Sequence, residues 1–441
     1  MPHNFEVVER RRIAGRLLRP IQVFVGTEVA GGVAVLAATI VAFAWANSPW
    51  DGRYFDLWAT SIDISAWRLS LHQSLGHLVS DGLMTLFFFV IGLETKRELL
   101  HGELAGVRKA ALPVAAALGG MIVPAAVFLA FNARGDGAAG WGIPIATDIA
   151  FALGVVALLG NRVPFALKVF LLALAVVDDI GAILVIALFY TDSLSLEASL
   201  WAIGIVVTII CARRAGIQSI AVYALLGAAL WFAVLKTGVH PTIAGVVLAI
   251  LTPASTARAS RPLPEEAAEL LSGLEADPES AQTRLNELEA LVRRNEAPLE
   301  RLERRLHPWV VFFVVPVFAL ANAGIPITTD SLETATTSAV SGGVFFGLLV
   351  GKPAGILFAT WLAVRLRVAT LPPGLGWNHI GGAAVLGGIG FTVSLFVTDL
   401  AFEGSPLAES ARLAILAASV AAAVAGYILL RLTPPVSPEG G

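Results

Sequence analysis

Two adjacent aspartates, Asp178 and Asp179, lie midway along an apolar run from Pro164 to Tyr190 that is long enough to cross a bilayer. At a rise of ~1.5 Å per residue, both carboxyl groups lie roughly 20 Å from either end of such a helix, near the middle of the hydrocarbon. A charged carboxylate at that depth is costly, and two neighbouring ones also repel each other. Because carboxylate oxygens bind hard cations as well as protons, the pair indicates the working site of an ion transporter.

A lysine lies at a similar depth in a second apolar run. Lys352 is midway along the run from 338 to 366. A buried ammonium group is as costly as a buried carboxylate, so we expect Lys352 to pair with Asp178 or with Asp179. Adjacent helical residues point about 100° apart, so one aspartate can bind a cation while the other faces the lysine.

Competition of cations and protons for the same carboxylate oxygens is enough to exchange one for the other. Loading Na⁺ expels protons, and loading protons expels Na⁺. Release of about two protons for each Na⁺ would move net charge in every cycle, so the membrane potential could drive it. The competition also predicts activity that falls in acid, where protons displace the ion.

Two other spans carry signs of interruption near their middle. In the fourth span Pro144 precedes a hydroxyl and a carboxylate, Thr147 and Asp148, and in the eleventh the segment 387–392 holds three glycines. The backbone groups freed by such breaks are tolerated in a membrane where they are reused at a site or against a neighbour. The fourth and eleventh spans hold corresponding positions within spans 3–5 and 10–12. This predicts inverted-topology repeats with the site at their centre.

Five further polar residues lie within spans or at their ends. Asp81 is in the outer half of the second span and could line an ion funnel. Glu94 and Glu98 lie near the cytoplasmic end of the same span. Their charges could serve a function or could equally be there only to solvate the end of the helix. His240 and His307 lie at span ends, and we interpret each as a hydrogen-bonded cap rather than a proton relay.

The composition indicates a protein with many membrane spans. Of the 441 residues, 56% are hydrophobic and 14% are charged, and the mean hydropathy is +0.78, which leaves too little charge for the surface of a soluble domain. The net charge of −3 gives no indication of nucleic-acid binding, and the single Cys211 excludes an internal disulfide framework. The apolar run 21–46 is about twice as long as the core of a signal peptide, so we interpret it as a retained first span.

Apolar runs of suitable length occur at twelve places, of which the eighth is too short to cross on its own. They are 21–46, 76–95, 109–131, 141–160, 164–190, 195–211, 217–236, 240–252, 308–323, 338–366, 379–401 and 411–431. With the N-terminus inside, five Lys and Arg residues fall in outer segments, Lys352 falls within a span, and the remaining 24 of the 30 fall inside. This bias places both termini in the cytoplasm. We therefore expect an all-α integral membrane protein with about twelve transmembrane helices, in which spans 4 and 11 are broken and cross.

We expect one membrane domain over residues 1–441, with two insertions outside the membrane. In the periplasmic loop 47–75, apolar and aromatic residues partly alternate with polar ones, which suits a short β-hairpin and equally suits aromatic residues at a membrane surface. The segment 253–307 is densely charged and has leucines at helical spacing. We interpret it as a solvated helical hairpin in the cytoplasm, with a role in sensing pH as the alternative.

Several long motifs, spread over nearly the whole chain, resemble those of the NhaA-type sodium/proton antiporters of bacterial inner membranes. The motifs are Gly92-Leu93-Glu94-Thr95-Lys96-Arg97-Glu98-Leu99, Ala146-Thr147-Asp148-Ile149-Ala150-Phe151-Ala152-Leu153-Gly154, Val177-Asp178-Asp179-Ile180-Gly181-Ala182-Ile183, Gly238-Val239-His240, His307-Pro308-Trp309, Phe318-Ala319-Leu320-Ala321-Asn322-Ala323-Gly324, Gly351-Lys352-Pro353 and Gly388-Ile389-Gly390-Phe391-Thr392. One departure is the cytoplasmic insertion from about 258 to 300, which is longer than expected for the family.

The resemblance implies an electrogenic antiporter that exports Na⁺ or Li⁺ in exchange for protons by alternating access and is activated at alkaline pH. It implies that Asp179 is the principal carboxylate for the cation and the protons, so that Asp179 and Asp178 would hold Na⁺ or Li⁺. Asp178 would pair with Lys352 and titrate with it. Thr147 and Asp148 would lie where the two broken helices cross, and Asp148 would balance the positive N-terminal ends of the half-helices.

The resemblance also implies roles outside the ion site. Asp81 would line the approach to it, and the family's cytoplasmic pH-sensing cluster falls on Glu94, Glu98, Glu303 and His307. The loop after the first span matches the family's hairpin, which implies a homodimer surrounded by membrane lipid. The expected partners are Na⁺, Li⁺ and H⁺, with no nucleic acid, no cofactor and no enzymatic activity.

Three other functions fit the residues less well. A cation-coupled symporter of a small solute, the main alternative, would need a larger polar pocket than these few acidic groups provide. The aspartates of an intramembrane aspartyl protease come from different helices. Membrane prenyltransferases hold Mg²⁺-diphosphate with spaced carboxylates, whereas Asp178 and Asp179 are adjacent.

Overall fold

The structure, a computed structural model, describes residues 29–66, 69–102, 104–191, 194–217, 219–254 and 297–434, together with the single residues 27, 283, 287, 288 and 291. The chain divides into two compact units. Unit 1 comprises Met1–Met84, Glu103–Thr191 and Pro308–Gly441, and unit 2 comprises Thr85–Gly102 and Asp192–His307. Most of the expected charged insertion 253–307, and the start of the expected first span, lie outside the described residues.

Within the described ranges, eight helices are long and apolar enough to cross a membrane, or ten if each of two bent pairs counts as one span. The eight are Val29–Ala46, Leu75–His101, Val107–Asn132, Phe165–Phe189, Leu196–Arg214, Pro298–Asn322, Ala339–Arg365 and Leu407–Leu432. The bent pairs fall at the expected spans 4 and 11, and two shorter apolar helices fall at spans 7 and 8. The predicted all-α membrane architecture is confirmed.

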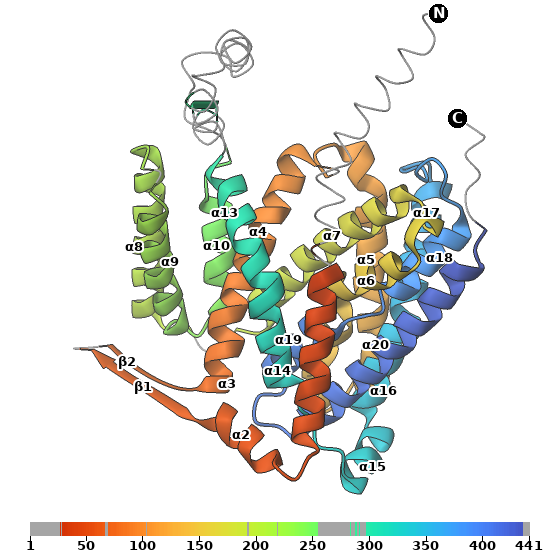
Figure 1. The fold of residues 1–441 in the computed structure, drawn as a ribbon, viewed down its shortest axis with the longest axis horizontal. Helices are drawn as coiled ribbons and strands as arrows, with labels where there is room; N and C mark the ends of the chain where they lie inside the picture. The colour runs from red at the N-terminus through yellow and green to blue at the C-terminus, as the bar shows by residue number, and fades with distance from the viewer. Residues whose placement is uncertain are drawn as a thin grey trace, which may run out of the picture. The chain divides into compact units, whose positions relative to one another are not determined.

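Unit 1 contains both bent pairs and the helices around them (Figure 1). Its elements after Val29–Ala46 are α2 (Asp51–Ala59), β1 (Ser61–Ala66), β2 (Leu69–Ser74), α3 (Leu75–Leu78), η1 (Val79–Leu83), α5 (Val107–Asn132), η2 (Asp136–Ile145), α6 (Ile149–Leu158), η3 (Gly160–Arg162), α7 (Phe165–Phe189), η5 (Val310–Val314), α14 (Val315–Asn322), α15 (Thr329–Thr337), α16 (Ala339–Phe346), η6 (Gly347–Gly351), α17 (Lys352–Arg365), α18 (Trp377–Leu386), α19 (Phe391–Ala401) and α20 (Leu407–Leu432). Within unit 1, α5 and α17 pack extensively against each other.

Small residues bring α5 and α17 into backbone contact. A methyl group added at Gly119 would lie 2.2 Å from the carbonyl oxygen of Gly355, and one added at Gly355 would lie 2.0 Å from the carbonyl oxygen of Gly119. Helices in a membrane associate largely through such close packing, because lipid supplies no hydrophobic drive between them. The contact places the start of α17, where Lys352 lies, beside the middle of α5.

The two bent pairs are η2 with α6, bent by 44°, and α18 with α19, bent by 45°. The first break follows Pro144, whose ring cannot donate a backbone hydrogen bond, and Ala146 is extended. The second break covers residues 387–390, where glycines allow other segments to approach closely. Each break is therefore encoded locally by its own residues.

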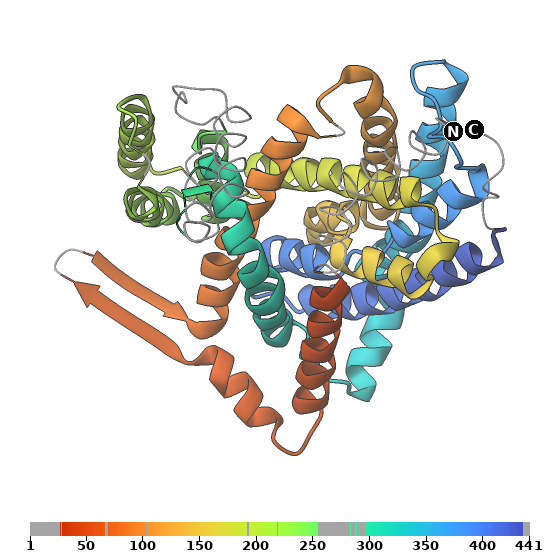
Figure 2. The ribbon, with the colours of Figure 1, turned by 45° about the horizontal axis from the view of Figure 1, so that its top comes forward.

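The predicted hairpin is present, although part of its pattern forms a helix. Strands β1 and β2 pair antiparallel, with Ser61 opposite Ser74, and the hairpin projects from the helices of unit 1 (Figure 2). Residues 54–58 of the expected alternating pattern lie instead in α2. Tyr54 is 1% exposed there, and its hydroxyl lies 2.8 Å from the carbonyl oxygen of Leu320, so Tyr54 packs inward, whereas Phe55 is 41% exposed.

Unit 2 is a smaller group of helices. Its elements are α4 (Met84–His101), α8 (Leu196–Arg214), α9 (Ile220–Leu235), α10 (Thr242–Leu251) and α13 (Pro298–Trp309). An apolar cluster joins α8, α9 and α10 through Ile209, Leu230 and Ala244. The helices α4 and α10 approach closely at Gly92, where an added methyl group would meet Ala249 at 2.7 Å.

Candidate functional site

Asp178 and Lys352 form an ion pair buried in unit 1. The Nζ atom of Lys352 is 2.9 Å from Oδ2 of Asp178, and both side chains are 0% exposed. Asp178 lies midway along α7, and Lys352 begins α17 after the wide helical turn η6. Wide turns of this kind are frequent at functional sites. Of the two pairings open from the sequence, the contact made in the structure is the one with Asp178.

The same ammonium group also reaches the first broken span. Lys352 Nζ donates a hydrogen bond to the carbonyl oxygen of Ile145, the last residue of η2. This carbonyl is one of those that the break leaves without a helical partner. Lys352 therefore links α7 to the broken span, and its charge faces one carboxylate and one backbone dipole.

Thr147 joins the ion pair to the second broken span. Its hydroxyl oxygen is 2.6 Å from Oδ2 of Asp178 and 3.0 Å from the carbonyl oxygen of Gly387. A hydroxyl carries one proton, so it can donate to only one of these oxygens at a time. Thr147 is 2% exposed, which leaves both contacts inside the protein.

Asp148 lies at the crossing of the two breaks. Its Oδ1 atom accepts from the amide of Phe151 and so caps α6, while its Oδ2 atom accepts from the amide and the hydroxyl of Thr392 at 3.1 and 2.6 Å. Its own amide donates to the carbonyl oxygen of Ile389. A carboxylate here faces the N-terminal ends of α6 and α19, which carry partial positive charge.

Asp179 follows Asp178 on α7 and is 6% exposed. It interacts electrostatically with Lys352. The second carboxylate oxygen of Asp178, Oδ1, is buried and has no hydrogen-bond partner among the described residues. In the same ranges no three His, Cys, Asp or Glu side chains gather into a metal centre.

Two hydroxyl groups hold the first broken span, and the sequence analysis did not single them out. Ser394 of α19 donates to the carbonyl oxygen of Ile143 at 2.8 Å, and Tyr190 at the end of α7 donates to that of Ala139 at 2.7 Å. Ser394 is 0% exposed. A polar residue within an apolar half-helix was the available signal for Ser394, whereas the role of Tyr190 depends on how α7 and η2 meet.

Residues 22–430 match the family described as "Na+/H+ antiporter 1". The chain belongs to this family. Curated relatives named Na(+)/H(+) antiporter NhaA include one from Anaeromyxobacter sp., 46% identical over 428 residues that cover 96% of this chain and 93% of the relative. The relative from Oleidesulfovibrio alaskensis is 45% identical and covers 95% and 94%, and that from Shewanella frigidimarina is 45% identical and covers 96% and 98%.

Membership of the Na⁺/H⁺ antiporter 1 family makes the chain a multi-span membrane protein of a bacterial transporter family, and its name gives Na⁺ and H⁺ as the ions. The match spans every residue of the site in unit 1 described above. The family resemblance inferred from the motifs is confirmed.

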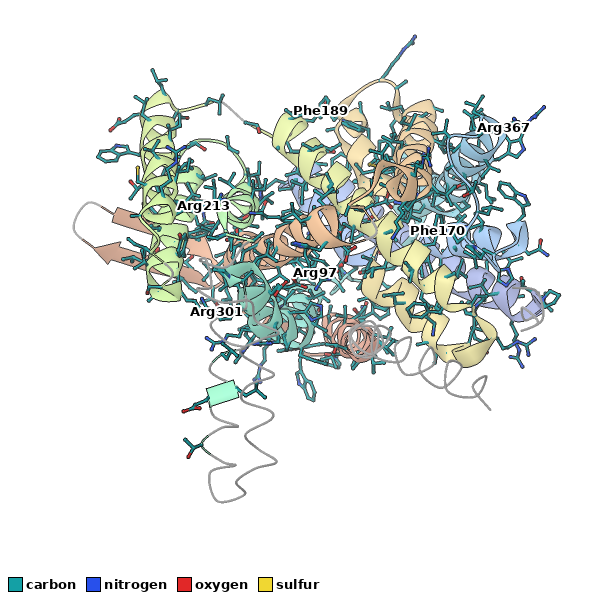
Figure 3. The ribbon with its side chains drawn as sticks, turned by 90° about the horizontal axis from the view of Figure 1, so that it is seen from above. Arg97, Phe170, Phe189, Arg213, Arg301 and Arg367 are labelled. Carbon is teal, nitrogen blue, oxygen red and sulfur yellow. The ribbon has the colours of Figure 1, made fainter. Side chains whose placement is uncertain are left out.

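The proposed pH-sensing residues of this antiporter lie in unit 2. Arg97 of α4 forms an ion pair with Glu303 of α13, where the two helices run side by side (Figure 3), and it is 3.6 Å from Glu98. Glu303 is 5% exposed and interacts electrostatically with His307. Glu94 is 8% exposed and lies one turn before Glu98 on α4. Glu98, Glu303 and His307 are thus close together around Arg97.

Asp81 lies in η1, in a different polar group of unit 1. It interacts electrostatically with His77, Glu403 and Asp399. His77 Nε2 is 3.1 Å from Glu403, and Asp399 is 2.6 Å from Arg412. Asp81 thus lies near Asp399, which pairs with Arg412, a contact that was not predicted from the sequence.

Proposed function

We propose that the protein is an electrogenic antiporter that exports Na⁺ or Li⁺ in exchange for protons by alternating access. The observation that carries the proposal is the buried Asp178–Lys352 pair, with Asp179 adjacent, at the crossing of two broken spans. Burying charged side chains inside a membrane protein costs much free energy, so residues of this kind usually belong to an ion pathway. Backbone groups freed at both breaks lie around Asp178 and Lys352, an arrangement found in transporters that bind ions at interrupted helices.

In this mechanism Asp179 binds the cation or protons, and the Asp178–Lys352 pair opens and closes with the occupancy of the site. A cation bound between the two aspartates neutralises the negative charge of Asp178 in place of Lys352. Because protons compete for the same oxygens, loading either species expels the other. Exchange of about two protons for each Na⁺ moves one net charge, so the membrane potential contributes to the driving force. Acid favours the protonated state, which accounts for activation at alkaline pH.

The same proposal includes the surroundings of the protein. The Lys and Arg bias supports an inner-membrane location with both termini in the cytoplasm. The projecting hairpin of β1 and β2 supports a homodimer, because the exposed edges of a two-stranded sheet can pair with a second copy. The group around Arg97, with Glu94, Glu98, Glu303 and His307, supports a cytoplasmic site that senses pH.

Everted vesicles carrying a pH gradient test the function. Addition of Na⁺ or Li⁺ should collapse the gradient, more strongly at alkaline pH, and K⁺ should not. Asp179→Asn should abolish the collapse of the gradient, and size-exclusion chromatography should show that the variant is still folded. Full activity of Asp179→Asn, or no response of the parent to Na⁺ and Li⁺ at any pH, would overturn the proposal.

A further inference from the structure

A second ion pair of unit 1 joins the ends of two helices, α19 and α20, and the proposed exchange does not use it. Asp399 is near the C-terminal end of α19, and Arg412 is in the second turn of α20. The Nη2 atom of Arg412 is 2.6 Å from Oδ1 of Asp399, and the two side chains are 26% and 17% exposed. Asp399 and Arg412 lie within two residues of the ends of the expected spans 379–401 and 411–431, where a partly buried charge is costly unless it is paired.

The ion pair is one polar contact between α19 and α20, and a second lies along the same pair of helices. Nearer the break, the amide of Phe391 donates to the hydroxyl oxygen of Ser419. The two helices follow each other in the chain and are joined by residues 402–406. Arg412 and Ser419 are seven residues apart and lie on one face of α20, and Phe391 and Asp399 are about two turns apart on α19, so the contacts are roughly 10 Å apart along the pair.

The N-terminal end of the half-helix α19 carries side chains that form hydrogen bonds where the two broken spans cross. Thr392 donates two hydrogen bonds to Oδ2 of Asp148, and Ser394 donates to the carbonyl oxygen of Ile143. Thr392 and Asp399 are seven residues apart and therefore lie on the same face of α19. With 11 residues and a break before it, α19 is too short to be held by helix propensity alone. Its position depends on contacts with its neighbours.

We infer that Asp399 and Arg412 are positioning residues for ion exchange. Their ion pair holds the C-terminal end of α19 against α20, and the Phe391–Ser419 contact holds its N-terminal end. Together these contacts keep Thr392 within hydrogen-bonding distance of Asp148. Around the pair, His77 and Glu403 interact electrostatically with Asp399, and Tyr54 and Glu409 do so with Arg412. The inference rests on the proposed exchange at Asp178 and Asp179.

The test separates a positioning role from a need for charge balance. Asp399→Leu combined with Arg412→Met removes both charges and leaves no uncompensated charge in the membrane, so this double variant should fold. The charge swap, Asp399→Arg combined with Arg412→Asp, restores an ion pair of opposite direction. Arg431→Gln is the matched control, because Arg431 is on α20 and its guanidinium contacts the exposed Tyr427 hydroxyl instead.

The readout is the apparent KM for Na⁺ and the maximal rate in everted vesicles, normalised to folded protein. We expect the apolar double variant to raise KM about tenfold, because small displacements of a site group are amplified in activity. The charge swap should return KM to within about twofold of the parent, and Arg431→Gln should leave it unchanged. A parental KM in the apolar double variant, or a charge swap as impaired as that variant, would overturn the inference.

The outcome is distinct from a failure of the proposed function. The parent is measured in the same vesicles, and absence of any Na⁺-driven exchange in the parent would defeat the exchange itself. Parental exchange together with an unchanged KM in the apolar double variant would defeat the positioning role alone.

Discussion

Lys352 makes its two oxygen contacts in different parts of unit 1. One is the charged Asp178 on α7, and the other is the neutral carbonyl oxygen of Ile145 at the end of η2. Neutralising Asp178 with a proton or a cation removes the stronger of these attractions, because hydrogen bonds to a charged group are roughly twice as strong as neutral ones. The Thr147 hydroxyl can then donate to Gly387 instead of Asp178. In the proposed mechanism, occupancy of the site would therefore change contacts of both broken spans.

At the residue scale, the sequence predicted the charged members of the site, because an isolated charge in an apolar run is visible without a structure. Asp178, Lys352 and Asp148 fall in this class. The charge pattern alone left Asp178 and Asp179 open as the partner of Lys352, since the choice depends on the rotation of α7, whereas the family resemblance implied Asp178. The contacts of Tyr190 and Ser394 depend in the same way on how helices meet.

His240 gives a pH-dependent prediction in unit 2, where it lies in the turn that precedes helix α10 (Thr242–Leu251). Burial lowers the pKa of His240 from 6.5 to about 4, and its Nδ1 atom is 2.9 Å from the Thr242 hydroxyl. Between these two values the unfolded chain binds a proton at His240 that the folded chain does not bind, so the free energy of unfolding should fall as the pH drops from about 6.5 to 4. His240→Gln should flatten that part of the profile.

Thermal unfolding of the purified protein in detergent, at steps of pH, checks this prediction. The parent should lose stability on acidification relative to His240→Gln, and the two curves should run parallel above pH ~7, where the histidine is neutral in both states. His101→Gln is the control, because His101 is exposed at the end of α4. Parallel curves for the parent and His240→Gln throughout the acid range would contradict the assignment.

At the scale of elements, the breaks of spans 4 and 11 were predictable because their causes are local. Pro144 removes a backbone donor, and the glycines of 387–390 allow close approach. Helix α2 was not predictable from alternation, because the aromatic residues of 54–58 suit a strand edge or a buried helix face equally. The contacts of Tyr54 with Leu320 and Gly324 decide between them.

The contact of α5 with α17 predicts a strong effect of a single methyl group. Gly119→Ala would place the methyl carbon 2.2 Å from the carbonyl oxygen of Gly355, so the helices must separate. We expect a loss of about 1–3 kcal/mol in the free energy of unfolding, the usual cost of overpacking. Gly204→Ala on α8 is the matched control, since nothing lies within 4 Å of the added methyl group there. It should be neutral or stabilising by up to ~1 kcal/mol.

Thermal or denaturant unfolding in detergent measures both variants. Because Gly355 lies one turn after Lys352 on α17, Gly119→Ala should also raise the apparent KM for Na⁺, whereas Gly204→Ala should not. Equal stability of the two variants would mean that α5 and α17 are not in backbone contact in the membrane.

At the scale of the whole molecule, the apolar runs predicted the twelve helical positions, including the two broken and two short ones, because hydropathy over a span needs no knowledge of packing. The division into two units was not predictable in this way. Unit 2 combines α4 with α8, α9, α10 and α13, which are distant in the sequence. Such grouping depends on contacts such as Gly92 with Ala249 rather than on local pattern.

The distribution of positive charges predicts the topology, and labelling with cysteine tests it. The native Cys211 is the only cysteine, so Cys211→Ser gives a background without thiols. Gly52→Cys in α2 should react with a membrane-impermeant maleimide in right-side-out vesicles, because 24 of 30 Lys and Arg residues place this loop outside. His101→Cys at the end of α4 should react only in everted vesicles. Gly52 and His101 are both exposed in their own units, so burial does not limit either reaction.

Reaction of both cysteines from one side would mean that the helix Leu75–His101 does not cross the membrane, and reversed sidedness would place the termini outside.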